Sequence, residues 1–108
     1  MTKVKFFKIK DKLTGFEIDG HTGYAKTGKD IVCAAISTAS QMALLCLTDE
    51  IKIKPEVKLL DGYLKVIVKE KDLDKTGVQL ILKTCLDTIK SIEKDYKKNI
   101  KLEVKENV

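Results

Sequence analysis

The amino-acid sequence predicts an α+β fold in which an antiparallel-rich sheet packs two helices on one of its faces. Two pairs of short segments alternate apolar and polar residues, as the strands of hairpins do. Two longer segments repeat apolar residues at helical spacing. The chain has 108 residues, of which 44% are hydrophobic, so we expect residues 1–108 to form a single domain. The expected order of elements is β-β-α-β-β-α-β.

The first hairpin is expected within the N-terminal segment. Lys3–Lys10 is typical of a strand because Val4 and Phe6 alternate with lysines. Phe16–Gly20 predicts a second strand, with Leu13–Gly15 as the turn between the two.

A long apolar helix is expected after a loop at His21–Lys29. Asp30 stands where a helix N-cap belongs, and apolar residues continue to about Leu47. They occupy almost every side of the helix, so the helix must be buried on several sides. The sheet would cover one side, and either the second helix or a partner subunit would cover another. Such a helix in a domain with so small a core favours a homodimer.

A second hairpin, a second helix and a final strand are expected in the second half of the chain. Val57–Leu59 and Leu64–Val68 alternate as strands, and Asp61–Gly62 is a tight-turn dipeptide between them. Lys75–Lys97 repeats apolar residues at helical spacing, which predicts the second helix. A final strand is expected at Asn99–Lys105.

The charge balance suggests nucleic-acid binding at first sight, but the type of basic residue argues against it. The chain has 21 basic residues, all of them lysine, against 16 acidic ones, for a formal net charge of +5. Base recognition and stacking prefer arginine, whereas lysine acts mainly as a point charge. We therefore expect no specific nucleic-acid site.

Other classes of protein are also disfavoured. No continuous apolar run, Ile31–Ile36 included, is long enough to span a bilayer, and no signal peptide is apparent. The spacing of Cys33, Cys46 and Cys85 fits neither a zinc site nor a redox dithiol. We expect reduced thiols, a cytoplasmic location, and no metal, cofactor or membrane partner.

One histidine and one cysteine form the candidate catalytic pair. Cys33 falls in the first turn of the expected helix, where free backbone N–H groups and the helix dipole favour a thiolate. His21, the one histidine of the chain, precedes it by a glycine-bearing loop that would bring the imidazole within proton-transfer reach. The alternatives are a buried core cysteine and a polar loop histidine. Core positions are the expectation for Cys46 and Cys85.

The segment around this pair carries a longer motif. It reads Gly20-His21-Thr22-Gly23-Tyr24-Ala25, then Gly28, then Asp30-Ile31-Val32-Cys33-Ala34-Ala35-Ile36-Ser37. This motif closely resembles the signature of the ribosomal-processing cysteine proteases of Firmicutes and related bacteria, in which alanine is usual at the position of Thr22. Length and expected element order agree as well, so the resemblance extends over essentially the whole chain.

The resemblance implies a specific activity. Members of that family remove the N-terminal extension of large-subunit ribosomal protein twenty-seven during ribosome assembly, and they are homodimers. By this resemblance Cys33 is the nucleophile and His21 the general base and acid. The partner would be the N-terminal peptide of the ribosomal protein, and the chemistry needs no metal or cofactor.

Further motif residues have open roles. Asp30 is either the helix N-cap or a group that orients His21. Ser37 lies one turn beyond Cys33, where it would bond near the active site or back to the carbonyl of Cys33. We expect a loop that closes over the substrate peptide, shaped by Gly20, Gly23, Tyr24 and Gly28.

Two other functions remain open from the sequence. A non-catalytic ribosome-associated or RNA-binding module would explain the lysine excess, and its affinity would fall steeply with salt. A structural dimer would leave His21 and Cys33 as bystanders.

Overall fold

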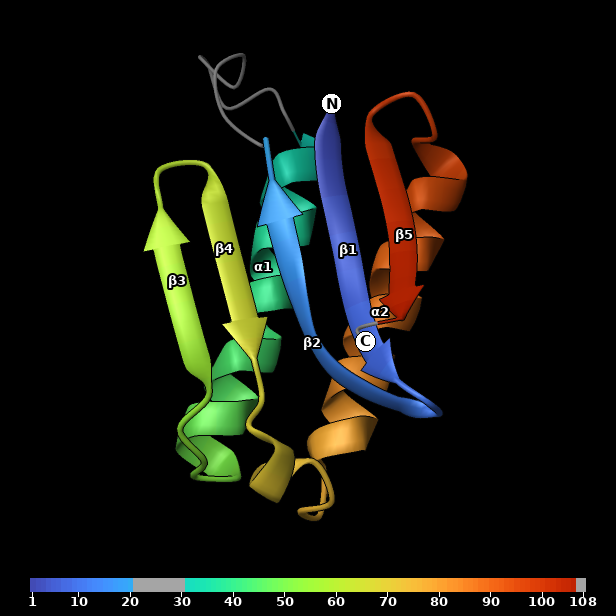
Figure 1. Ribbon diagram of the computed structural model, residues 1–108. Helices are drawn as coiled ribbons and strands as arrows, with labels where there is room; N and C mark the ends of the chain where they lie inside the picture. The colour runs from blue at the N-terminus through green and yellow to red at the C-terminus, as the bar shows by residue number, and fades with distance from the viewer. Residues whose placement is uncertain (21–30, 107–108) are drawn as a thin grey trace.

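The computed structural model describes residues 1–20 and 31–106 and shows a five-stranded sheet with two helices on one face (Figure 1). The strand order is β3-β4-β2-β1-β5, and the element order β-β-α-β-β-α-β confirms the sequence prediction. The elements are β1 (Thr2–Ile9), β2 (Lys12–Asp19), α1 (Ile31–Leu45), the π-helical turn η1 (Cys46–Glu50), β3 (Glu56–Leu60), β4 (Tyr63–Ile67), the 3-10 turn η2 (Glu70–Asp72), α2 (Val78–Asp95) and β5 (Ile100–Glu106).

The sheet is mixed but mostly antiparallel. β1 pairs with β2, β2 with β4 and β3 with β4, all antiparallel, whereas β1 and β5 are parallel. A parallel pair needs a long crossover connection, and α2 supplies part of the chain between β4 and β5. Because β1 pairs with both β2 and β5, it is hydrogen-bonded on both sides.

The core lies between the sheet and the helices. Phe6 and Phe16 oppose each other in register on β1 and β2, with ring centroids 5.5 Å apart. Ile36 of α1 and Leu82 and Ile89 of α2 are fully buried in the same cluster. The helices therefore pack on the face of the sheet that carries this aromatic pair.

The turn of the first hairpin differs from its prediction. The turn falls at Lys10–Asp11, and Leu13–Gly15 belongs to β2. The longer strand is required because β2 also pairs with β4: the N–H of Val68 donates to the carbonyl of Thr14, and Gly15 pairs with Ile67. Gly15 suits this crowded position, since a Cβ there would lie 2.1 Å from the carbonyl oxygen of Val66.

The helices also begin and end at slightly different residues than predicted. α2 begins at Val78 because Gly77, at φ 93°, precedes it in the left-handed region. α1 ends at Leu45, and the π-helical turn η1 follows it directly and ends at Glu50.

Within the part of the chain that the structure describes, one helical stretch is long enough to cross a membrane. Ile31–Glu50 has 20 residues and a mean hydropathy of 1.8, which differs from the expectation drawn from short apolar runs. The test is one of length and composition only, and core helices also pass it. Ile36, Ala43 and Leu47 of this stretch are fully buried in the core, whereas Ile31, Met42 and Leu45 are more than half exposed.

Candidate active site

Cys33 lies in the first turn of α1, on the side that faces the sheet. Its side chain is 6% exposed. The first turn of a helix leaves backbone N–H groups without an intrahelical partner, and its dipole is positive there. Both features stabilise a thiolate and the oxyanion formed when a thiolate attacks a carbonyl.

A hydroxyl of β1 contacts the cysteine. Thr2 Oγ1 lies 3.4 Å from Cys33 Sγ, and Thr2 is fully buried. Sequence reasoning missed this residue, although a signal was present. The alternation of Val4 and Phe6 on the inner face of β1, extended by one step, places Thr2 on that same face.

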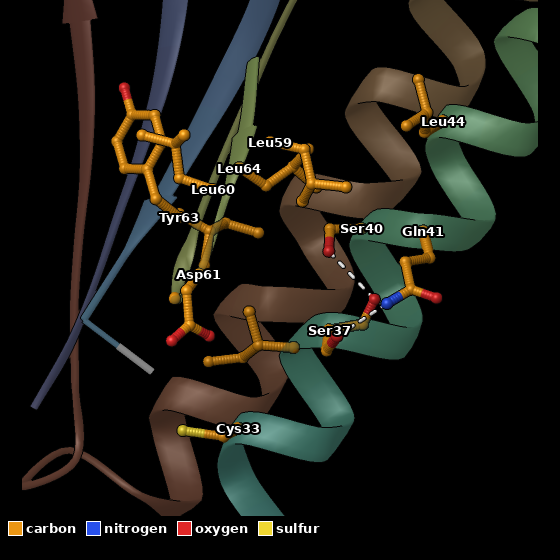
Figure 2. Close-up of a pocket in the computed structure, with 13 residues that line it drawn as sticks. Cys33, Ser37, Ser40, Gln41, Leu44, Leu59, Leu60, Asp61, Tyr63 and Leu64 are labelled. Atoms are coloured by element: carbon orange, nitrogen blue, oxygen red, sulfur yellow. Dashed lines mark hydrogen bonds between the residues drawn. The ribbon is translucent and has the colours of Figure 1, made fainter. Parts of the chain in front are cut away.

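A groove runs from Cys33 along α1 and has the β3–β4 hairpin as its opposite wall (Figure 2). Its volume is about 600 Å³, within the usual range of ligand sites. The walls are mainly apolar and comprise Ile18, Ile36, Leu44, Leu59, Leu60 and Leu64. Polar residues also line it, namely Ser37, Ser40, Gln41, Asp61 and Tyr63. Cys33 is at one end of the groove and Leu44 is farther along α1.

Ser37 is another predicted site residue that the structure places in the groove. Its hydroxyl accepts a hydrogen bond from Gln41 Nε2 at 2.9 Å, and its backbone carbonyl accepts one from Ser40 Oγ at 3.0 Å. Figure 2 shows these bonds on the α1 wall of the groove. The structure thus brings Ser37 and Cys33 to one surface, and a role of Ser37 in catalysis stays a prediction.

Gly20 directly follows β2, beside this groove. Its N–H donates to the carbonyl of Gly62, a groove residue, at 3.1 Å, and its φ of 86° is one that glycine adopts readily. The remaining predicted site residues lie outside the described residues: His21, Gly23, Tyr24, Gly28 and Asp30. Their roles stay predictions.

The three cysteines occupy different environments. Cys85 is 3% exposed on α2, and its thiol donates to the carbonyl of Ala39 at 3.8 Å. Burial raises the pKa of Cys85 to about 12. Cys46 is half-buried in η1, and Cys33 alone among the three lines the groove. For residues 1–20 and 31–106, no group of three His, Cys, Asp or Glu side chains is placed to hold a metal ion.

Comparisons with known proteins agree with this geometry. A family model described as "Cysteine protease Prp" matches residues 1–101. The chain is 34% identical over 97 residues to the ribosomal processing cysteine protease Prp of Staphylococcus aureus, covering 87% of this chain and 89% of that protein.

Two crystal structures of Prp from S. aureus have the same fold. The complex with a covalently linked product peptide has a TM-score of 0.84 and 29% identity, over 97% of this chain and all of the other. The complex with a substrate peptide has a TM-score of 0.83 and 28% identity, with the same coverage.

We predict that iodoacetamide near neutral pH modifies Cys33 roughly tenfold or more faster than Cys85, because alkylation needs the thiolate. A thiol whose pKa is about 12 is protonated at neutral pH and reacts only as the pH approaches that value. Cys33 has the helix N-terminus beside it and opens onto the groove. Peptide mass spectrometry of a labelling time course measures all three rates. Equal, slow labelling of Cys33, Cys46 and Cys85 would contradict an activated thiolate.

Proposed function

The chain belongs to the cysteine protease Prp family, and from that membership we propose that it removes the N-terminal extension of a large-subunit ribosomal protein during ribosome assembly. One observation carries the proposal: Cys33 lies in the first turn of α1 at the end of a groove of about 600 Å³. The relatives in S. aureus bind substrate and product peptides, which supports a peptide as the ligand of this groove. A cytoplasmic location is part of the proposal, since ribosomes assemble there.

The proposed mechanism is acyl transfer to Cys33. The thiolate attacks the scissile carbonyl, and backbone N–H groups at the start of α1 stabilise the oxyanion. His21 then protonates the leaving amine and afterwards activates the water that hydrolyses the acyl-enzyme. The protein's own groups supply each of these steps.

The groove supports binding of an extended peptide with apolar side chains. Leu59 and Leu60 of β3 line its outer wall although they are 73% and 56% exposed. Each apolar side chain that a bound peptide buries contributes about 1 to 2 kcal/mol to binding. We propose that these leucines contact the residues next to the scissile bond.

We also propose that the enzyme is a homodimer through an exposed side of α1. Ile31, Met42 and Leu45 are each more than half exposed. Met42 and Leu45 follow Ile31 by about three and about four helical turns. All three side chains therefore lie on one side of the helix, away from Ser37 and the groove. The protomer therefore leaves one apolar side of α1 uncovered, as the sequence prediction of a partner subunit requires.

Membership in a protease family argues against the two other functions considered from the sequence. A non-catalytic RNA-binding module or a purely structural dimer explains neither the match of residues 1–101 to cysteine proteases nor the position of Cys33 at a peptide-sized groove. The lysine excess is then a solvated surface suited to a ribosomal environment.

Cys33→Ala and His21→Ala are expected to reduce cleavage of the extended ribosomal protein by roughly a thousandfold or more, because each removes a member of a unit that acts together. Cys33→Ser should be almost as impaired, since neither the helix N-terminus nor His21 is expected to ionise a serine hydroxyl. Cleavage is followed by mass spectrometry of the processed protein. Cys46→Ala is the matched control and should retain wild-type activity. Near wild-type cleavage by either alanine variant would show that the pair is not catalytic.

Leu59→Asp is expected to raise KM for an extended peptide about tenfold with little change in kcat, because it removes an apolar contact in the groove and leaves the nucleophile intact. Leu80→Asp on α2 is the matched control. Both leucines are 73% exposed, so both substitutions should be tolerated by the fold, but Leu80 does not line the groove. An equal KM for the two variants would place the substrate elsewhere.

Met42→Glu is expected to convert a dimer into a monomer of 12.1 kDa, because a charge on the uncovered side of α1 disfavours its burial between copies. Sedimentation at micromolar concentration measures the mass. Leu80→Glu should leave the dimer intact. A wild-type monomer at these concentrations would refute the dimer proposal, and an unaffected Met42→Glu dimer would locate the interface on another surface.

A further inference from the structure

The hydroxyl of Thr2 is a buried polar group directed at the sulfur of Cys33. Thr2 Oγ1 and Cys33 Sγ are 3.4 Å apart, within hydrogen-bonding distance for sulfur, and Thr2 has no measurable exposure to solvent. Buried hydroxyls that lack a partner are costly, so this contact is expected to persist in solution. Thr2 and Cys33 are 31 positions apart in the sequence, so the fold brings them together and not local chain geometry.

The backbone holds Thr2 in place on both sides. Its N–H donates to the carbonyl of Asn99 at 2.9 Å, and Thr2 is in register with Ile100 of the parallel strand β5. On the other side β1 is paired with β2 from Lys3 onward. The hydroxyl is therefore positioned before any substrate binds, as an electrostatic group at a reaction centre must be.

We propose that Thr2 stabilises the thiolate of Cys33 through a hydrogen bond from its hydroxyl to Sγ, an inference that rests on Cys33 being the nucleophile of the proposed function. A hydroxyl accepts from a thiol and donates to a thiolate, so it partners both states. The bond to the thiolate is the stronger one because it is charge-assisted and shielded from water. Thr2 thus increases the fraction of Cys33 that is ionised at neutral pH.

Comparison with Cys85 shows why such a group is needed. Cys85 is about as buried as Cys33, and burial raises the pKa of its thiol to about 12. At Cys33 the first turn of α1 and the hydroxyl of Thr2 both oppose this effect of desolvation. The hydrogen bond to Thr2 and the helix N-terminus together keep a buried thiol reactive.

The test is the pH dependence of Cys33 alkylation in Thr2 variants. Thr2→Val retains the branched shape and removes the hydroxyl, whereas Thr2→Ser retains the hydroxyl. We expect the pH midpoint of iodoacetamide alkylation to rise by about one unit in Thr2→Val and to stay near wild type in Thr2→Ser. Cleavage at neutral pH should fall about tenfold in Thr2→Val and recover as the pH rises above the new midpoint.

Thr14→Val is the matched control. Thr14 is also a buried strand residue, but its hydroxyl has no hydrogen-bond partner among the described residues. Its substitution should leave the midpoint unchanged. Should Thr2→Val fail to fold, Thr2→Ala compared with Thr2→Ser makes the same comparison of a missing and a retained hydroxyl.

The outcomes separate this inference from the proposed function. An unchanged midpoint in Thr2→Val, or equal shifts in Thr2→Val and Thr2→Ser, overturns the role of the hydroxyl. An activity loss of the same size at every pH likewise overturns it, because a packing defect does not depend on ionisation. A wild-type protein that neither cleaves the substrate nor labels Cys33 ahead of Cys46 overturns the proposed function itself.

Discussion

The packing of α1 against the two central strands is the constraint on which the site depends. Phe6 and Phe16 belong to the apolar face of β1 and β2, and the fully buried Ile36 of α1 is part of the same core cluster. Ile36 lies three residues after Cys33, so the same packing that excludes water from the core sets the position of Cys33. The contact between Cys33 and Thr2 exists because helix and strand are held at this one spacing. A shift of α1 along the sheet would separate the sulfur from both the hydroxyl and the groove.

Much of the fold was accessible from the sequence, because the periodicity of apolar residues determines which face of each element is buried. The order of elements and the hairpin around Asp61–Gly62 follow from such local patterns. The turn at Leu13–Gly15 was wrong because β2 must also pair with β4, a requirement that no local pattern contains. Likewise, nothing in the alternation of β5 indicates that it lies parallel to β1.

The site was predictable to a smaller extent. Cys33 and Ser37 were found from helix position and motif, and both line the groove. The groove itself depends on how far the β3–β4 hairpin stands from α1, which is a property of the assembled fold. Thr2 was missed because its partner is 31 positions away, even though strand alternation placed its side chain inward. The cysteines illustrate the same limit, since Cys33 on α1 lines the groove whereas Cys85 on α2 is a core group whose pKa burial raises.

The two sides of the groove differ in how freely their residues can change during evolution. Every residue of β3, the strand at the edge, is exposed to solvent, whereas Cys33 and Thr2 are buried in the body of the domain. Substitutions on β3 therefore alter one wall of the groove at little cost in folding free energy. This wall of the groove is therefore free to change with the sequence of a bound peptide, while the core holds the surroundings of Cys33 constant.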